Sequence, residues 1–355
     1  MLIAALAALI TAIFVPPDRE YLGYFDLKTL SCLFTVLAIV CALGNQRFFY
    51  TLAEKIVKRF RNARLAALAI IYITFIGSML IANDMALLTF LPLGYFVLIS
   101  SHKEKYMCPL FILQNIAANL GGMLTPFGNP QNLYIYSKFN VDTAKFMLTM
   151  LPPFLLSVTL ITLVAIILIK PEPLVFSGVE RRLPKLRISV YLVIFAFAIL
   201  CVFKLVPYYY ALAVTVPALL IMDRRALLQV DYGLLLTFVF FFIFAGNMSR
   251  IPAVRELFSS LLDKSTLVVS ALSCQVISNV PTAILLSEFT ESWRPLLLGV
   301  NIGGVGTLIS SLASLITFKE YTLHNPGGSG KYIAVFSVLN FSFLAILLVF
   351  SSFFV

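Results

Sequence analysis

Two stretches of the sequence are almost copies of each other, and both interrupt apolar segments. NLGGMLTPFGNPQN runs from Asn119 to Asn132 and NIGGVGTLISSLAS from Asn301 to Ser314; aligned, they share an Asn, two consecutive Gly and a Thr. Broken backbone of this kind is tolerated at membrane depth only where protein or a water-filled cavity satisfies its polar groups. A paired interruption is therefore typical of the binding site of a transporter.

Composition places the chain in a membrane. Hydrophobic residues make up 61% and charged residues 12%, and the mean hydropathy is +0.98, whereas soluble domains are about half apolar and about a quarter charged. The apolar runs are of helical length, and 355 residues suit roughly nine to eleven segments of about 20 residues each. We therefore predict an all-α polytopic membrane protein.

The net charge of +10 does not indicate a nucleic-acid partner. The Lys and Arg residues lie in loops between apolar segments, where the positive-inside rule accounts for them. The five cysteines lie in or at the edge of apolar segments without a CxxC spacing, so they predict buried small side chains rather than a disulfide framework or a metal site.

The apolar runs, and the polar, glycine and proline residues that separate them, predict two similar halves. The first half, residues 1–170, would contain helices at 1–15 and 27–45, an interfacial stretch at 46–64, a helical hairpin at 65–101, a broken helix at 107–138 and a plain helix at 146–169. A polar linker, 171–187, follows. The second half, 188–355, would contain helices at 188–206, 209–222 and 231–247, a polar stretch at 248–264, a hairpin at 265–289, a broken helix at 294–318 and a last helix at 332–354.

The distribution of basic residues predicts how these halves are oriented. If each hairpin re-enters the side that it left, one side carries most of the Lys and Arg residues, in 46–64, 102–106, the linker, 223–225 and 319–331. That side should be cytoplasmic, which makes the linker and the N-terminus cytoplasmic and the C-terminus external. The hairpins then enter from opposite sides, so we predict two inverted-topology repeats, each with a re-entrant hairpin and a broken transmembrane helix.

Asp84 is the most informative single residue. It stands with Asn83 at the expected tip of the first hairpin, inside a run that is otherwise nearly free of charge. A carboxylate at mid-membrane costs about 2.5 to 3.5 kcal/mol on insertion scales, so it normally faces a cavity or a cation. Asp84 is thus a candidate cation ligand or proton carrier. A helix N-cap is the alternative role, and the two are compatible.

The first break supplies further polar groups. Gly121 and Gly122 permit unusual backbone, and Pro126 and Pro130 prevent a continuous helix. Oxygen ligands suit a small hard cation, and a helix N-terminus suits an anion, although a proline-kinked helix with satisfied side chains remains the structural alternative. Thr125, Gly128, Asn129, Gln131 and Asn132 would line the gap. We predict a cation- or proton-coupling site, able to hold Na⁺ and requiring no other metal or cofactor, at Asn83, Asp84, Thr125, Gly128 and Asn129.

The second half is polar at the corresponding places but has no acid there. The halves are therefore chemically unequal, and we expect the first to dominate ion coupling and the second to contribute more to cargo binding. The predicted substrate-binding residues, taken from both halves, are Asn83, Asn129, Asn132, Ser278, Asn279, Thr282, Thr307, Ser310 and Ser311.

Three motifs resemble those of a known family: LTPFGNPQN, QVISNVPTAILL and NIGGVGTLISSLASLI. Over essentially its whole length the chain resembles the ion transporter superfamily, which includes arsenite permeases, citrate transporters, sodium–proton antiporters of the NhaD type and dicarboxylate symporters. The likeness is closest to the YbiR-type inner-membrane permeases. The resemblance implies a scaffold domain and a transport domain, with two hairpins whose tips carry asparagine and two unwound helices.

Departures from the dicarboxylate symporters bear on the cargo. Their tips carry Ser-Asn-Thr; Asn83 and Asn279 match the tip asparagines, Ser278 matches a serine, and residues 128–132 match their Gly-Thr-Pro-Pro-Asn loop. Ala82 and Asp84 replace the first Ser and Thr, and Val280 replaces the second Thr. The lost hydroxyls argue against dicarboxylate binding, and Asn83-Asp84 resembles the arsenite permease tip instead.

Together these features predict a secondary active transporter of a bacterial or archaeal plasma membrane. It would move a small anion, an inorganic oxyanion or a carboxylate, by alternating access coupled to Na⁺ or H⁺; the alternative is a Na⁺/H⁺ antiporter or an arsenite-type metalloid efflux permease. The expected partners are lipid and the small ion, with a homodimer left open. Paired inverted breaks argue against a channel, and the chain has no HExxH or GxSxG motif of an enzyme.

Overall fold

The computed structural model describes residues 1–174 and 184–354, so Arg181 and Arg182 of the predicted linker, and Val355, lie outside the described residues. Within the described ranges the regular structure is helical apart from one isolated bridge between Asn62 and Pro173. The first half holds α1 (Leu2–Phe14), η1 (Arg19–Tyr24), α2 (Leu27–Asn45), α3 (Phe48–Val57), α4 (Ala63–Ile81), α5 (Asn83–Ser100), η2 (Glu104–Tyr106), α6 (Met107–Gly121), η3 (Gly122–Leu124), α7 (Pro130–Lys138) and α8 (Thr143–Leu168). The second holds α9 (Lys185–Val202), α10 (Tyr208–Met222), α11 (Arg224–Leu228), α12 (Tyr232–Ser249), α13 (Pro252–Ile277), α14 (Asn279–Leu286), α15 (Trp293–Ile302), α16 (Leu312–His324), η4 (Pro326–Gly328), α17 (Ser329–Ser351) and η5 (Ser352–Phe354).

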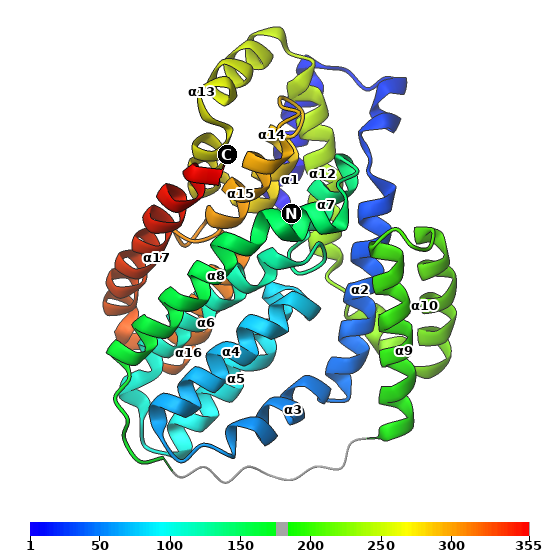
Figure 1. Ribbon diagram of the computed structural model, residues 1–355. Coiled ribbons are helices and arrows are strands. Elements are labelled where there is room, and N and C mark those ends of the chain that lie inside the picture. The colour runs from blue at the N-terminus through cyan, green and yellow to red at the C-terminus, as the bar shows by residue number, and fades with distance from the viewer. Residues whose placement is uncertain (175–183, 355) are drawn as a thin grey trace.

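In the described part of the chain, 9 helical segments are long and apolar enough to cross a membrane. Two further apolar helices, α1 and α10, are shorter, with 13 and 15 residues. This confirms the all-α polytopic membrane class. Figure 1 shows α1 running only from about mid-height to one end of the molecule.

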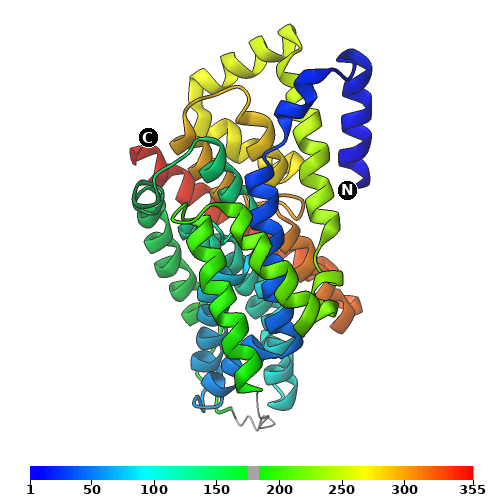
Figure 2. The same cartoon turned by 90° about the vertical axis from the view of Figure 1, so that its right-hand side faces the viewer.

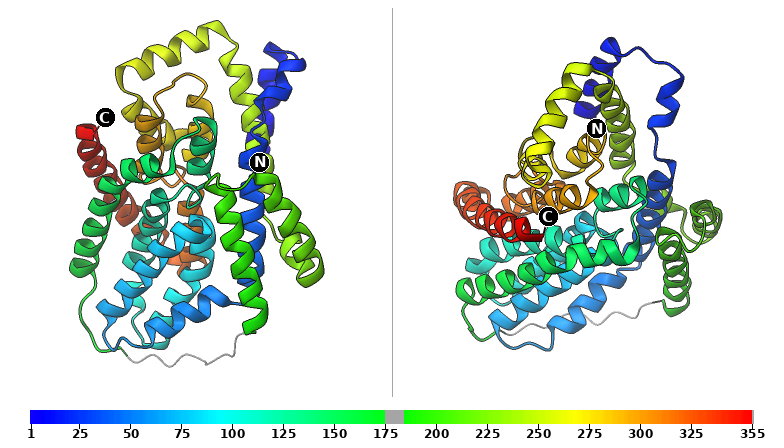
Figure 3. Two further views of the ribbon diagram at one scale, coloured as in Figure 1. Left: turned by 45° about the vertical axis from the view of Figure 1, so that its right-hand side comes forward. Right: turned by 45° about the horizontal axis from the view of Figure 1, so that its top comes forward.

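The helices form two groups that stand side by side (Figure 3, left). In the scaffold group, α2 packs against α9, α10 and α11, and α12 packs against α1 (Figure 2). In the hairpin group, the pairs α4–α5 and α13–α14 enclose the broken helices α6–α7 and α15–α16, with α8 and α17 alongside. The groups meet where α12 contacts α14 and α2 contacts α7. The resemblance implied a two-part architecture of this kind.

Corresponding elements of the two halves lie at opposite ends of the molecule. Short helix α3 crosses one end and the first part of α13 crosses the other (Figure 1). The predicted polar stretch 248–264 is thus mostly helical, since α13 starts at Pro252 and bends at Ser265, where φ is −170° and ψ 98°. Placement at opposite ends is the arrangement expected of inverted repeats.

Both hairpins turn at a residue with positive φ. Ala82, between α4 and α5, has φ 66° and ψ 153°, and Ser278, between α13 and α14, has φ 73° and ψ 159°. This region is essentially restricted to glycine, and another residue there stores about 1 to 3 kcal/mol of strain. The two tips therefore share one strained backbone conformation although their sequences differ.

Relief of this strain can be tested. Ala82→Gly should stabilise the folded protein by about 1 kcal/mol, because glycine adopts this conformation without a Cβ clash, and Ala82→Val should destabilise it. The measurement is the apparent melting temperature of the purified protein in detergent. Ala86→Gly, one turn further along the same helix where φ is ordinary, is the control and should lower that temperature. A decrease for Ala82→Gly equal to that of the control would contradict the strain at the tip.

A polar clamp holds the end of the molecule near α3. Glu172, after α8, accepts hydrogen bonds from Lys103 Nζ at 2.7 Å, Lys105 Nζ at 2.6 Å and Tyr106 Oη at 2.8 Å, and its backbone oxygen accepts from Ala63 N at 2.8 Å. Hydrogen bonds from Lys103 first, and then from Lys105 and Tyr106, lower the pKa of Glu172 from 4.5 to about 2. The clamp joins the starts of α4 and α6 to the end of α8.

The depressed pKa of Glu172 predicts a pH dependence. A carboxylate whose pKa is lower in the folded state stabilises the protein above its unfolded pKa, here 4.5, and loses that contribution as pH falls toward about 2. Glu172→Gln should therefore lower the apparent melting temperature by a few degrees at pH 7. The gap between variant and wild type should narrow as the melting curves are recorded at pH values falling below 4.5. A gap that stays constant down to the acid end would show that the charge of Glu172 is not the cause.

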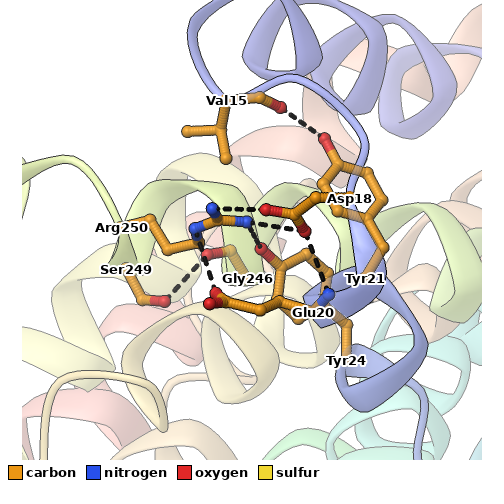
Figure 4. Close-up of polar contacts among 8 residues, drawn as sticks. All are labelled: Val15, Asp18, Glu20, Tyr21, Tyr24, Gly246, Ser249 and Arg250. Carbon is orange, nitrogen blue, oxygen red and sulfur yellow. Dashed lines mark hydrogen bonds and ion pairs between the residues drawn. The ribbon is translucent and has the colours of Figure 1, made fainter.

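A second clamp closes the opposite end (Figure 4). The Arg250 guanidinium, just after α12, donates to both oxygens of Asp18 at 2.6 and 3.1 Å and to Tyr24 Oη at 3.1 Å, and lies 3.3 Å from Glu20 Oε2. The hydrogen bond from Arg250 lowers the pKa of Asp18. A Cβ on Gly246 would stand 2.6 Å from the Tyr24 ring, so this glycine permits η1 to lie against α12. These contacts lie within the scaffold group.

Candidate functional site

One pocket of about 420 Å³ brings both hairpin tips and both breaks together. Its wall contains the first residues of four helices of the hairpin group: Asn83 and Asp84 of α5, Gln131 of α7, Asn279 of α14 and Leu312 of α16. The start of α12, with Asp231 and Thr237, closes it from the scaffold group. The pocket therefore lies at the boundary between the two groups.

Three of the four helices that begin at this pocket have no side-chain cap at the N-terminus. Ala82, Asn129 and Ser278 precede α5, α7 and α14, and their side chains accept no hydrogen bond from the first turn. Of the four hairpin-group helices that begin at the pocket, only α16 has such a cap, where Ser311 Oγ accepts from Ala313 N at 3.2 Å. A helix N-terminus is the positive end of the helix dipole, which suits an anion. In α14, however, the N–H groups of Asn279, Val280 and Thr282 already bond to Ser310 O, Asn279 Oδ1 and Ser278 O.

The threonine and glycine residues that are repeated in the two breaks have the same structural role in each half. Thr125 Oγ1 donates to the Met79 carbonyl at 2.8 Å, and Thr307 Oγ1 donates to the Gln275 carbonyl at 3.0 Å. Met79 and Gln275 both stand four residues before the tip asparagine. A threonine thus ties each break to its own hairpin.

The aligned glycines Gly121 and Gly303 also have matching surroundings in the two halves. A Cβ on Gly121 would lie 2.2 Å from the Phe75 carbonyl oxygen, and one on Gly303 would lie 2.8 Å from the Ala271 carbonyl oxygen. Phe75 and Ala271 each stand eight residues before the tip asparagine. Both glycines are therefore needed for the close approach of broken helix and hairpin, which is a packing reason for the repeat.

The repeated asparagines join the two halves to each other. Asn119 Oδ1 accepts from Ser311 Oγ at 2.8 Å, and Asn301 Oδ1 accepts from Asn129 Nδ2 at 3.1 Å. In the aligned breaks, Asn129 and Ser311 occupy the same position, ten residues after the asparagine. Each half thus donates to the asparagine of the other, which is the reciprocal pattern that a two-fold relation between the halves produces.

The tip asparagines are buried and hold their own turns. Asn83 Oδ1 accepts from Asp84 N at 3.0 Å, and Asn279 Oδ1 accepts from Val280 N at 2.9 Å. Asn83 also donates to Asn119 Oδ1 at 3.2 Å. Both side chains line the pocket while stabilising the tip, so a ligand role and a structural role coincide in them.

Asp84 has the features expected of an ion-coupling group. It lines the pocket, and its Oδ1 is buried without a hydrogen-bond donor from the described residues. Asp231 faces the same pocket, although its Oδ1 also caps α12 by accepting from Leu234 N at 2.8 Å. The described lining contains no Lys, Arg or His side chain. Met1 also lines the pocket and carries the terminal amino group, so the two carboxylates still leave the lining negative, which favours the entry of a cation or a proton.

The predicted site residues divide into two sets. Five line the pocket, namely Asn83, Asp84, Ser278, Asn279 and Ser311. The others shape the surrounding loops: the hydroxyls of Thr125, Thr282, Thr307 and Ser310 donate to backbone carbonyls, Asn132 Nδ2 donates to three carbonyls, Asn129 donates to Asn301, and Gly128 packs against the Gly122 carbonyl. For these residues a role as ligands stays a prediction.

The pocket also contains a carboxylate, Asp231, and an amide, Gln131, that are not among the predicted ligands. In the sequence, Asp231 stands at the start of the predicted helix 231–247, and only the contact of α12 with α14 brings it to the pocket. Gln131 belongs to the predicted gap and, as the second residue of α7, lines the pocket. The alignment of Asn301 with Asn119 in the two breaks is a sequence signal for this site, but it does not identify the groups that Asn301 contacts.

Comparison with known proteins identifies a family and relatives. The family model described as a citrate transporter matches residues 1–293. The chain is 31% identical over 309 residues to a Methanocaldococcus jannaschii protein named uncharacterized transporter MJ0456, covering 84% of this chain and 82% of the relative. It is 28% identical over 311 residues to the inner membrane protein YbiR of Escherichia coli, covering 86% of this chain and 83% of that protein.

More distant likenesses extend the comparison. The silicon efflux transporter LSI3 of rice, Oryza sativa subsp. japonica, is 28% identical over 155 residues, which cover 43% of this chain and 31% of LSI3. Among solved structures, the YdaH transporter of Alcanivorax borkumensis superposes with a TM-score of 0.57 at 13% identity, covering 94% of this chain and 86% of that one. At that identity the likeness concerns the fold alone.

Proposed function

The chain belongs to the citrate transporter family, and from this premise we propose that it is a secondary active transporter for a small anion, coupled to Na⁺ or H⁺. The family model and two of the relatives are named as transporters. The anion is an inorganic oxyanion or a carboxylate. The membrane is a plasma or inner membrane, with the N-terminus cytoplasmic and the C-terminus external.

The observation that carries the anion proposal is the convergence of four helix N-termini on one pocket. Each N-terminus carries a partial positive charge of roughly half a unit, which attracts an anion without a basic side chain. The carboxylates of Asp84 and Asp231 would repel an anion that arrived alone. A coupling cation bound beside them removes this repulsion, so the anion and cation bind together.

The two-group architecture supplies a means of alternating access. Asp84 and the four helix N-termini belong to the hairpin group, whereas Asp231 belongs to the scaffold group. The groups meet mainly where α12 packs against α14 and α13 and where α2 packs against α7 and α4. Movement of the hairpin group along the scaffold, as an elevator or by rocking, would carry the site from one side of the membrane to the other.

Flux measurements on the purified full-length protein in proteoliposomes test this proposal. Radiolabelled carboxylates and oxyanions are offered with Na⁺ gradients, with proton gradients and with neither. The expected result is saturable uptake of one anion, stimulated by one of the gradients and capable of counterflow. Flux that does not saturate and shows no counterflow would overturn carrier transport in favour of a pore.

A second candidate is cation–proton antiport or efflux of a neutral metalloid without an organic anion. The observation in its favour is the pair of carboxylates in a pocket whose described lining has no basic side chain. The two candidates separate in one measurement. Cation-coupled flux that persists after every anion except an impermeant buffer is removed supports antiport, and flux that stops supports anion transport.

A further inference from the structure

Two short turns meet across the boundary between the scaffold group and the hairpin group. One joins α9 to α10 in the scaffold group and contains Phe203 and Lys204; the other joins α7 to α8 in the hairpin group and contains Asn140 and Val141. Each turn has a residue in the left-handed region, with φ 62° at Lys204 and 45° at Asn140. Asparagine tolerates this region, whereas lysine rarely adopts it, so the conformation at Lys204 needs support from its contacts.

The Lys204 ammonium group supplies this support by binding the hairpin group. Its Nζ donates to Asn140 Oδ1 at 2.9 Å and to the Val141 carbonyl at 2.8 Å, and it lies 4.0 Å from the centre of the Tyr136 ring. An ammonium has three donors, and the face of an aromatic ring attracts a cation. Among the side-chain hydrogen bonds between described residues, these two are the ones that join the scaffold group to the hairpin group.

The neighbouring residue, Phe203, reaches the first break. Its ring packs edge-on against the ring of Phe127, with the two centroids 5.7 Å apart. Phe127 is buried and lies between η3 and α7, whereas Tyr136 lies near the end of α7. The α9–α10 turn therefore contacts the chain at both ends of α7, the helix that carries Gln131 in the pocket wall.

The surroundings of Lys204 suit a contact that can open. Burial first, and the nearby charge of Lys28 second, lower the pKa of Lys204 to about 8, while the charge of Asp142 acts in the opposite direction. Within the described residues no carboxylate forms an ion pair with Lys204 Nζ. Desolvation of the ammonium group therefore offsets part of the energy of its contacts, which suits a contact that forms and breaks in each transport cycle.

We propose that the α9–α10 turn is a latch, in which Lys204 and Phe203 hold the hairpin group against the scaffold group and must release it before the hairpin group can move. The latch rests on the proposed alternating access, because it acts on the movement that carries the pocket across the membrane. It lies at the end of α9 that is opposite the linker, which is the external side in the proposed orientation. Its release therefore sets how readily the transporter leaves this conformation.

Distances between spin labels on the two groups test the latch in the purified full-length protein in lipid nanodiscs. The labels are attached to Leu205→Cys in the α9–α10 turn and to Ala144→Cys in α8, two exposed positions, while the native cysteines are buried. With the latch intact, double electron–electron resonance should give one dominant distance. Lys204→Met, which keeps the length of the side chain but removes its charge, should raise the population at other distances about tenfold relative to the main one.

Two further variants make this measurement decisive. Lys185→Met, the same change at the exposed start of α9, is the matched control and should leave the distance distribution of the wild type unchanged. Asn140→Gly removes the acceptor on the other side of the boundary, and glycine adopts φ 45° freely, so it should act in the same direction as Lys204→Met. It also serves if Lys204→Met folds poorly. A wild-type distribution in Asn140→Gly and in folded Lys204→Met would overturn the latch.

Cross-linking separates the latch from the proposed function. In Leu205→Cys/Ala144→Cys, a bifunctional methanethiosulfonate reagent, whose length is chosen from the measured distance, joins the two thiols; each forms a disulfide and releases methanesulfinate. Anion flux in proteoliposomes should stop and should return after reduction with dithiothreitol, whereas the single-cysteine variants should be unaffected. Full flux in the cross-linked protein would overturn the latch and leave transport intact. Absence of flux in the wild type would contradict the proposed function, and the spin-label distances would still decide whether the latch exists.

Discussion

Asp84→Asn should fold and insert normally but lose cation-driven transport by about tenfold or more at subsaturating cation. The estimate follows from the loss of one charged ligand, worth about 1.5 to 3 kcal/mol, where 1.4 kcal/mol is a factor of ten in affinity. Asparagine keeps the size and one oxygen, so the tip turn through Asn83 Oδ1 and the backbone of residue 84 is retained. The measurement is initial uptake in proteoliposomes as a function of the imposed Na⁺ or proton gradient.

Two further variants serve as comparisons for the effect of Asp84→Asn. Asp142→Asn is the matched control, because Asp142 only caps α8 by accepting from Lys145 N at 3.0 Å, and asparagine caps a helix equally well. Its gradient dependence should equal that of the wild type. Asp231→Asn keeps the cap of α12 but removes a charge from the pocket wall, and a smaller loss than for Asp84 is expected. Unchanged coupling in Asp84→Asn would remove this residue from the mechanism.

Gly121→Ala should have the largest effect on folding. Its Cβ would lie 2.2 Å from the Phe75 carbonyl oxygen and 2.5 Å from Ser78 Oγ. The nearest obstacle is backbone of α4, which cannot swing away as a flexible side chain does, so hairpin and broken helix must separate. Such overpacking costs about 3 kcal/mol at the upper end of its usual range. A large fall in the apparent melting temperature and in the yield of monodisperse protein is expected.

Gly44→Ala is the matched control for that change. Gly44 also lies in a helix, as the second-to-last residue of α2, but a Cβ there would meet nothing within 4 Å. Alanine is favoured over glycine in a helix by about 1 kcal/mol, so the control should be neutral or slightly stabilising. The same substitution is thus expected to act with opposite sign at the two positions. Equal melting temperatures for both variants would contradict the close contact at Gly121.

The hairpins and breaks could be predicted from the sequence because their signals are local. The predicted hairpin 65–101 corresponds to α4 and α5, Ala63 to Ser100, and the break lies between Gly121 and Pro130, within the predicted Asn119 to Asn132. Helix length follows from the length of the apolar run, and glycine and proline end helices through their own backbone. The start of α13 at Pro252 differs because its polar first part is a helix at the end of the molecule, where no apolar run is needed.

The candidate site could be predicted only in part. Asp84 is conspicuous because a carboxylate in an apolar run is rare, and it does line the pocket. Asp231 is inconspicuous because an aspartate at the start of a helix is ordinary capping chemistry. Thr125 and Thr307 are polar and suitably placed, yet their hydroxyls donate to carbonyls of their own hairpins. A polar residue in an apolar segment needs a hydrogen-bond partner, but the sequence does not show whether that partner is the protein backbone or a ligand.

The sequence by itself therefore determined the membrane class, the helical elements and the two paired breaks, since apolar length, glycine and proline act within a few residues of themselves. Only the tertiary structure decided what the breaks contact. Asn119 accepts from Ser311, and Asn301 accepts from Asn129 and Gln131 while it donates to Asn132. The direction of an amide depends on which groups face both of its ends, and those groups meet only when the two halves pack together.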